Sequence, residues 1–254
     1  MKICPHCHQE NPDQAKFCLG CGTKISPLQK ETVSESADQG ERRQMTLFFC
    51  DLVDSTPLSE RMDPEDYRQM ILDYHDVAEK VINLHGGKVG NYIGDGLLVY
   101  FGYPEGLENS AITAVQTAIA VIEALDEVRR RWEDPRANIY IKIRVGMHTG
   151  LVIVDDHLAL GETVNLAARL EGLAPHNGIV VSPQTLDLIK GWFKVKSLGE
   201  KSLKGISEPV EVYEVTGETG ARTRLDISKF KGLSPLVGRE DELKRLRETW
   251  ALAR

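Results

Sequence analysis

The 254-residue sequence lacks several features that would place it in a familiar class of protein. It has no apolar run of about eighteen residues, which a membrane-spanning helix requires. Its first residues, MKICPHCHQE, lack the apolar stretch of a secretory signal peptide. With 31 basic and 38 acidic residues, a net charge of −7 argues against a surface dedicated to nucleic acid. These absences predict a cytoplasmic protein that binds neither membrane nor nucleic acid.

Cysteine is scarce after the first 21 residues. Cys50 alone lies beyond them, and its place in an apolar run predicts a small buried side chain. The others follow the pattern Cys-x2-Cys, ten residues, Cys-x2-Cys, which is typical of a structural zinc site in a zinc ribbon. His6 and His8 are alternative ligands. The expected Zn²⁺ ligands are Cys4, Cys7, Cys18 and Cys21.

Composition divides the chain into four parts. Residues 1–25 are the cysteine module, and 26–43 are polar, without periodicity, and read as a linker. Hydrophobic periodicity predicts a folded domain over 44–216. The last part, 217–254, begins as a linker and ends in FKGLSPLVGREDELKRLRETWALAR, which resembles the entry into an AAA-type ATPase domain. No Walker phosphate loop follows, so we expect the chain to be truncated before the rest of that domain.

The folded domain alternates strand and helix patterns. Strands are expected at 45–50, 88–93, 97–101, 139–148, 151–154 and 178–181, with a final hairpin at 193–215. Helices are expected at 63–84, 109–132, 163–173 and 184–190. This order predicts an α+β fold, a ferredoxin-like βαββαβ arrangement with an antiparallel sheet and helices on one face.

Two aspartates stand in matching contexts, each beside an apolar run that reads as a buried strand. Asp51 lies in TLFFCDLVDST, and Asp95 lies at the expected hairpin tip of NYIGDGLLVYFG. A carboxylate in such a place is costly unless a cation or a hydrogen-bond donor pairs with it. The two together therefore predict a shared Mg²⁺ site. The alternative is that Asp51 caps a strand end and Asp95 forms a turn.

Five ordered segments identify residues 43 to about 216 as similar to a class III nucleotidyl cyclase catalytic domain. They are FFCDLVDST, YIGDG, IRVGMHTG, GETVNLAARLE and LKGISEPVEVYEV. The resemblance implies that the ribose 3′-hydroxyl of ATP attacks the α-phosphate, giving cyclic AMP and pyrophosphate. It also implies two Mg²⁺ or Mn²⁺ ions per site. With the zinc ribbon and the AAA-like segment, the layout resembles bacterial cyclase-ATPase fusions.

The resemblance implies a site built from several segments. Asp51 and Asp95 match the metal-binding aspartates, and the Leu52 carbonyl would be a further ligand. Asn165 and Arg169 match the transition-state pair, which orients the ribose and stabilises charge at the α-phosphate. A surface ion pair is the alternative for Arg169, although no acid stands three or four residues away. The other implied substrate contacts are the Asp54, Ser55 and Thr56 turn, which also starts a helix, Gly94, and Lys204, for which a solvated lysine is the alternative.

Two positions depart from the family's purine pocket. Asn91 stands where adenylyl cyclases usually carry lysine and guanylyl cyclases glutamate, and an amide both donates and accepts. Leu158, at the partner position, can only pack. ATP is therefore expected from its abundance and from the family, and the alternative is a nucleotide-binding regulatory module without turnover. His148, in GMHTG, is expected to be a packed histidine.

The family's active site lies between two cyclase domains, with the aspartates from one and the Asn/Arg pair from the other. This chain carries a single copy of each segment. The resemblance therefore implies a homodimer with two equivalent sites.

Overall fold

The computed structural model describes residues 2–3, 9–11, 20, 41–155, 158–221, 223–231 and 238–252. The chain forms two compact units, Met1–Gln39 and Gly40–Arg254. In the first unit, strands β1 (Lys2–Ile3) and β2 (Glu10–Asn11) pair antiparallel. The four predicted zinc ligands, and all of the predicted linker before its last three residues, lie outside the described residues.

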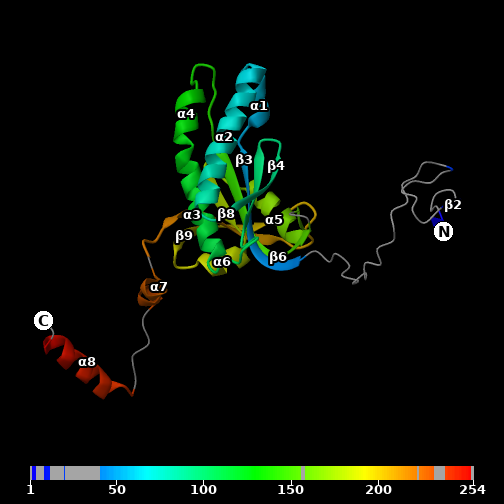
Figure 1. Ribbon diagram of the computed structural model, residues 1–254. Coiled ribbons are helices and arrows are strands. Elements are labelled where there is room, and N and C mark those ends of the chain that lie inside the picture. The colour runs from blue at the N-terminus through cyan, green and yellow to red at the C-terminus, as the bar shows by residue number, and fades with distance from the viewer. Residues whose placement is uncertain are drawn as a thin grey trace. The chain divides into compact units, whose positions relative to one another are not determined.

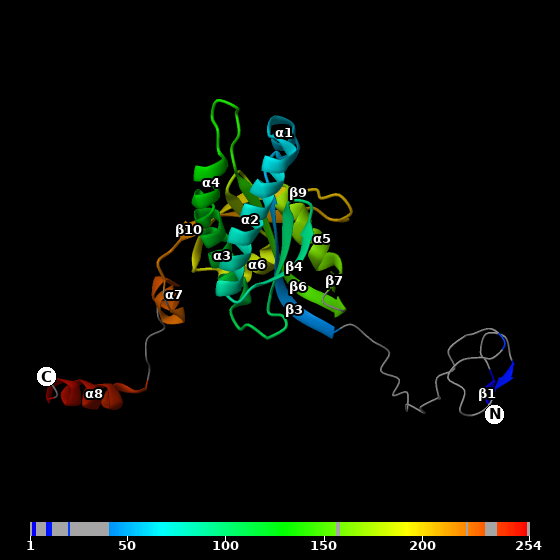
Figure 2. The same cartoon turned by 45° about the horizontal axis from the view of Figure 1, so that its top comes forward.

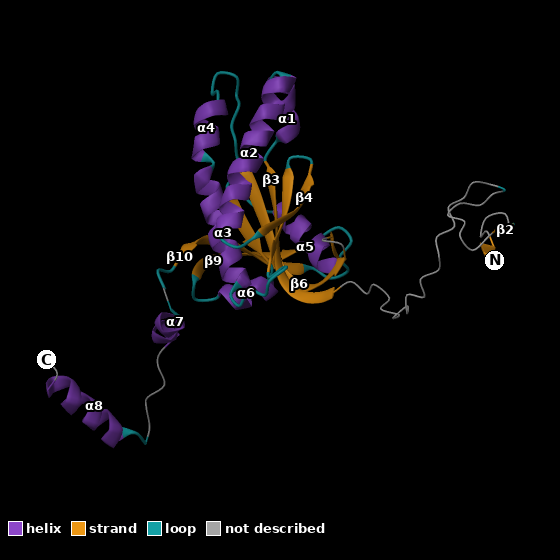
Figure 3. Cartoon of the chain, in the orientation of Figure 1, coloured by secondary structure: helices purple, strands orange, loops and turns teal. Residues whose placement is uncertain are grey.

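A mixed sheet forms the centre of the second unit (Figure 1; Figure 3). Its order is β4-β5-β3-β6-β8-β10-β9, with β7 pairing with β6 beside this path. Neighbouring strands are antiparallel except β6 and β8, which are parallel. The strands are β3 (Glu41–Leu52), β4 (Lys88–Ile93), β5 (Gly96–Phe101), β6 (Ile143–Asp155), β7 (Leu158–Leu160), β8 (Gly178–Val181), β9 (Phe193–Lys201) and β10 (Val210–Glu218).

The helices follow the predicted periodicity closely. The helix α2 begins where expected because the Asp63 side chain accepts a hydrogen bond from the Glu65 amide at 3.0 Å. In the described part of the chain, no helix is long and apolar enough to cross a membrane. The helices are α1 (Ser55–Arg61), α2 (Pro64–Leu84), α3 (Ser110–Ala124), α4 (Asp126–Trp132), α5 (Glu162–Glu171), α6 (Pro183–Ile189), α7 (Arg224–Lys231) and α8 (Glu240–Leu252).

Both faces of the sheet are covered, so the prediction that helices lie on one face is wrong. Alternate residues of β3 point to opposite faces. Phe48 and Cys50 pack in one cluster with side chains of α2 and α3, which lie together against the strands in Figure 1. Met45 and Leu47 pack in a second cluster with Ala167 of α5. The predicted α+β fold is confirmed, and the sheet is antiparallel as predicted except between β6 and β8.

Several predicted boundaries differ from the structure. The strand expected at 45–50 is β3, Glu41–Leu52, so residues 41–43 of the predicted linker belong to the sheet, where they pair with β6. The strands expected at 139–148 and 151–154 are one strand, β6, because Gly150 pairs with Met45 instead of turning the chain. A Cβ on Gly150 would lie 2.7 Å from Thr163 Oγ1, so this glycine admits α5 to the sheet. The predicted helix 109–132 breaks at Leu125 into α3 and α4. In Figure 2, β3, β6 and β7 extend together below the rest of the sheet.

Candidate active site

The two aspartates lie side by side at one end of the sheet. Asp51 is near the end of β3, and Asp95 lies in the two-residue turn between Ile93 and Gly96, which are paired. Gly94 makes this turn with φ +65°. A Cβ on Gly96 would lie 3.1 Å from Asp51 Oδ1, so the hairpin backbone passes directly against the Asp51 carboxylate. The predicted juxtaposition, with the aspartate at the hairpin tip, is what the fold produces.

The environment of the pair favours a cation. Both side chains are partly buried. Burial, followed by the charge and hydrogen bonding of Asp95, raises the pKa of Asp51 to about 7. Asp95 Oδ2 is buried and has no hydrogen-bond partner in the described part of the chain. A buried oxygen of this kind is costly, and a turn-forming role for Asp95 leaves it unexplained. Two clustered carboxylates suit a hard divalent cation such as Mg²⁺ or Mn²⁺.

A further charged pair stands beside the aspartates, and the sequence interpretation missed it. Arg144 of β6 is the cross-strand partner of Asp51. Its Nε lies 2.9 Å from Glu171 Oε1 at the end of α5. Burial raises the pKa of Glu171 despite Arg144, and the charge of Asp95 raises it further. The sequence does point to this pair, because Arg144 is a charged residue within an apolar strand. A charge there is costly unless another group pairs with it.

The close approach of α5 to β6 brings Glu171 to this place. A Cβ on Gly146 would lie 1.9 Å from the Glu171 nitrogen. Only glycine therefore allows the end of the helix to rest on the strand at this point. One cation and three carboxylates consequently share one end of the sheet.

The turn after β3 leads directly into α1. Asp54 occupies the N-cap position with φ 56°, in the left-handed region, and its side chain makes no capping hydrogen bond. A side-chain cap by Asp54 is therefore absent, although the helix begins at Ser55 as the sequence indicated. The turn is held by the backbone, since the Val53 amide donates to the Lys142 carbonyl at 2.8 Å. Leu52 is fully buried beside this turn.

Asn165 and Arg169 lie one turn apart on α5, as expected. Both side chains are exposed, and neither makes a hydrogen bond or ion pair within the described residues. The surface ion pair considered for Arg169 is thus absent there. The helix is held by its opposite side, where Leu166, Ala167 and Leu170 are buried. Among the described residues, no hydrogen bond or ion pair joins Asn165 or Arg169 to Asp51 or Asp95.

The remaining predicted residues are spread around this region. Asn91 is exposed on the edge strand β4, next to a register shift. Leu158 begins β7, and its side chain is outside the described residues. Lys204 is exposed in the connection between β9 and β10. His148 is packed, as predicted: burial lowers its pKa to about 4, and Nδ1 lies 2.7 Å from Ser182 Oγ.

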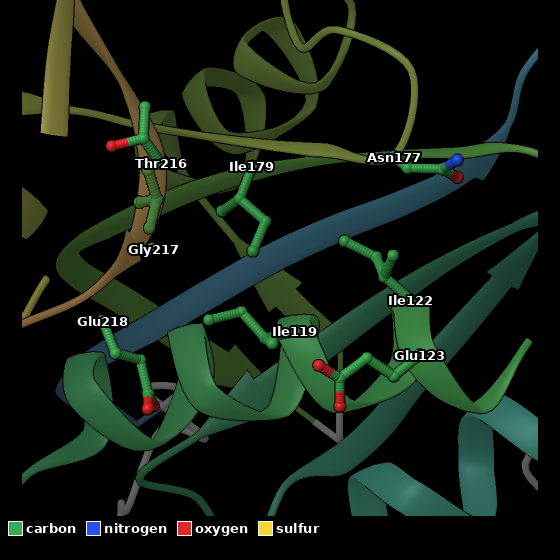
Figure 4. A pocket seen from close by; sticks show the side chains of 9 residues that line it. Ile119, Ile122, Glu123, Asn177, Ile179, Thr216, Gly217 and Glu218 are labelled. Carbon is green, nitrogen blue, oxygen red and sulfur yellow. The ribbon is translucent and has the colours of Figure 1, made fainter. Parts of the chain in front are cut away.

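A separate cavity of about 440 Å³ lies between α3 and the strands β8 and β10 (Figure 4). Ile119, Ile122 and Ile179 point into it, and Glu123 and Glu218 stand at its edge. Neither Asp51 nor Asp95 lines this cavity. The charged end of the sheet is therefore the candidate site.

Comparison with known proteins assigns a family to each of two regions. Residues 38–217 match the model of the adenylate and guanylate cyclase catalytic domain, and residues 3–25 match a zinc-ribbon domain. Adenylate cyclase 1 of Rhizobium meliloti is 29% identical over 74% of this chain, which spans 31% of that relative's length.

Solved structures show the same fold. The adenylyl cyclase CyaB from P. aeruginosa has a TM-score of 0.66 at 30% identity, covering 71% of this chain and 97% of the other. The guanylyl cyclase Cya2 has a TM-score of 0.67 at 28% identity, covering 73% and 98%. The chain thus resembles cyclases of both purine specificities.

Proposed function

Because this chain belongs to the adenylate and guanylate cyclase catalytic domain family, we propose that it converts ATP to 3′,5′-cyclic AMP and pyrophosphate. The observation that carries the proposal is the partly buried Asp51 and Asp95 pair, in which Asp95 Oδ2 has no hydrogen-bond partner among the described residues. Such a pair suits phosphate chemistry that depends on divalent cations. The choice of ATP is supported by the similarity to Adenylate cyclase 1 of Rhizobium meliloti.

In this proposal, Asp51, Asp95 and the Leu52 carbonyl hold two Mg²⁺ or Mn²⁺ ions. When bound, such ions activate the attacking ribose oxygen and neutralise the phosphates. The backbone of Asp54, Ser55 and Thr56 receives the phosphate tail where α1 begins. Arg144 places a fixed positive charge on the same face of the sheet as Asp51, which suits it to orient the triphosphate.

The second half of the site is proposed to come from another copy of the chain. Asn165 would orient the ribose, and Arg169 would stabilise charge developing at the α-phosphate. Both are exposed and lack partners among the described residues. Leu151 is 61% exposed and Ile153 39%, an apolar surface suited to a partner. We therefore propose a homodimer with two equivalent sites, with Lys204 contacting the triphosphate.

The residues of the proposed purine pocket leave an alternative function, which is nucleotide binding without turnover. Gly94, Asn91 and Leu158 would lie near the base, and an exposed asparagine reads a purine less sharply than a charged side chain. A chain that binds nucleotide without converting it would be a regulatory module. The transition-state pair favours turnover, because a sensor has no need of it.

The deciding experiment offers each of the four nucleoside triphosphates with Mg²⁺ or Mn²⁺ and identifies the product by mass. We expect 3′,5′-cyclic AMP from ATP. Cyclic GMP alone would correct the substrate and keep the reaction. Nucleotide binding without any cyclic product would establish the regulatory module instead.

The other parts of the chain complete the proposal. Residues 1–25 form the zinc ribbon with Zn²⁺ on Cys4, Cys7, Cys18 and Cys21, which metal analysis would detect as one Zn²⁺ per chain. The proposed linker, 26–43, ends before Glu41, where β3 begins, and the proposed cyclase domain of 44–216 extends to include all of β3 and β10, which ends at Glu218. Residues 217–254 are proposed to be a linker and the start of an AAA-type ATPase domain, on the resemblance of their sequence alone. Thiolates free to bind zinc suit a reducing, cytoplasmic location.

A further inference from the structure

Helix α2 reaches the backbone of both aspartate-bearing segments with two neighbouring residues. Tyr74 OH lies 3.2 Å from Cys50 Sγ and 3.4 Å from the carbonyl of Cys50, the residue before Asp51. His75 Nε2 lies 3.1 Å from the carbonyl oxygen of Asp95 itself. Because a carbonyl only accepts, Nε2 carries the proton in this contact. One helical segment thus joins the two strand ends that supply the carboxylates.

The His75 ring contacts two tyrosine rings. Its centroid lies 5.1 Å from the Tyr74 ring and 4.9 Å from the Tyr92 ring, both tilted. These contacts limit the rotation of the imidazole and keep Nε2 directed at the turn. Tyr92 also donates a hydrogen bond from its hydroxyl to Glu79 Oε2 at 2.7 Å. Within the described residues, helix α2 therefore makes a hydrogen bond to Asp95 through His75 and a separate one to Tyr92 through Glu79, and the second does not involve Asp95.

The hairpin needs such an anchor for two reasons. It lies at the edge of the sheet, where β4 has no neighbour beyond it in the described sheet and its last three residues are exposed. Its tip also carries a carboxylate facing Asp51, and two like charges this close repel each other. β5 is paired with β3 from Leu97 onward, so the Asp95 turn lies beyond these pairs and the repulsion acts on the part of the hairpin that β3 does not hold.

We propose that His75 is a positioning residue that holds the backbone of Asp95 against β3 so that the two carboxylates can share a divalent cation. This inference rests on the proposed metal role of Asp51 and Asp95. It adds a residue to the site that does not touch the metal or the nucleotide. The effect of His75 passes through the Asp95 peptide, since that carbonyl is its hydrogen-bond acceptor.

The test compares three variants of the full chain. His75→Phe keeps an aromatic ring between the two tyrosines and removes the donor. His75→Gln replaces the ring with a side chain that still carries an N–H donor. Tyr92→Phe is the matched control, because it removes one hydrogen bond between the same helix and the same hairpin, away from Asp95. Mn²⁺ binding is measured by electron paramagnetic resonance without nucleotide, and thermal melts compare folding.

Losing one hydrogen bond should weaken Mn²⁺ binding of His75→Phe about fivefold. We expect His75→Gln to recover most of the affinity and Tyr92→Phe to stay within about twofold of the original protein. In turnover assays, the KM for Mn²⁺ should rise in His75→Phe while kcat at saturating Mn²⁺ changes little. A general loss of packing would instead move Tyr92→Phe and His75→Phe together.

Equal Mn²⁺ affinity in His75→Phe and Tyr92→Phe would overturn the inference. If His75→Phe does not fold, His75→Gln is compared with Tyr92→Phe. The proposal then requires the His75→Gln protein to bind Mn²⁺ as well as the control does. Weaker binding would reject a donor role for His75. Failure of the proposed function would give a different result from failure of this inference. In that case Mn²⁺ binding still separates the variants, while no cyclic nucleotide is formed by any protein.

Discussion

The two halves of the proposed site differ in how far one chain completes them. Asp51 and Asp95 are partly buried, crowded by Arg144 and Glu171, and tied to α2. Asn165 and Arg169 project from α5 into solvent without partners among the described residues. Folding thus brings the proposed metal half together, whereas the proposed transition-state half has no partner among the described residues of one chain.

The close carboxylates of the metal half raise the free energy of the folded protein when no cation is bound. Like charges held together in a partly buried place are unfavourable until a cation binds. Removing the Asp51 carboxylate should consequently weaken metal binding, whereas removing Arg169 should slow the chemical step.

The largest effect is expected for Asp51→Ala. Loss of a metal ligand should lower formation of cyclic nucleotide about 10³-fold or more, since metal ions supply several kcal/mol to such reactions. Mn²⁺ binding, measured without nucleotide, should fall as well. Retained activity in a folded Asp51→Ala protein would remove this residue from the metal site.

Arg169→Ala should reduce kcat about 10²-fold, the usual scale for one group that stabilises a transition state. Its Mn²⁺ affinity without nucleotide should stay unchanged, because the arginine lies outside the carboxylate cluster. This pattern separates the two halves. Weakened metal binding would instead tie Arg169 to the carboxylates of its own chain.

Mixing Asp51→Ala with Arg169→Ala chains tests whether the halves come from two copies. Random exchange would make half the dimers mixed, each with one intact site of two, so activity should recover to about a quarter of the original. Each variant mixed with itself is the control. No recovery under conditions that exchange subunits would argue against shared sites.

Gly146→Ala should disturb the place where α5 meets the metal half. The new Cβ would meet the Glu171 backbone, so we expect about 1–3 kcal/mol of destabilisation in urea melts. Gly106→Ala is the matched control, because nothing lies within 4 Å of its Cβ position. Equal stability of both variants would mean that the helix moves away without cost.

The smallest effect concerns pH in metal-free protein. The pKa of Asp51 rises from 3.8 to about 7 on folding, so the native state binds more protons between these values. Stability from this group is therefore lost as pH rises through that window. Relative to Asp51→Asn, the original protein should become less stable as pH rises from about 4 to about 7 in EDTA melts.

His148 works in the opposite direction, which is why the variant comparison is necessary. Its pKa falls from 6.5 to about 4 on folding, so its contribution is lost as pH falls through that range. Added Mn²⁺ should stabilise the original protein most at high pH, where Asp51 is ionised. A pH-independent difference between the original protein and Asp51→Asn would contradict the raised pKa.

Local patterns in the sequence predicted most of the secondary structure and the positions of both aspartates. The alternation and helical periodicity located most elements, and Asp63 marked the start of α2. The GDG turn indicated that Asp95 lies at a hairpin tip, because glycine and aspartate favour such turns. The apolar runs beside Asp51 and Asp95 identified both as costly carboxylates. These features depend on neighbours in the chain, which a sequence displays directly.

Only the tertiary structure decided how the segments meet. The sequence pattern predicts a break in the strand around Gly150, but in the structure this glycine leaves room for Thr163. Gly146 leaves room for the backbone of Glu171 in the same way. Arg144 reaches the acidic cluster through strand register, and His75 meets Asp95 through the packing of α2 on a hairpin. Such contacts join residues far apart in the sequence, so no local pattern encodes them. The sequence by itself determined which groups carry charge, and packing decided which of them one chain brings together.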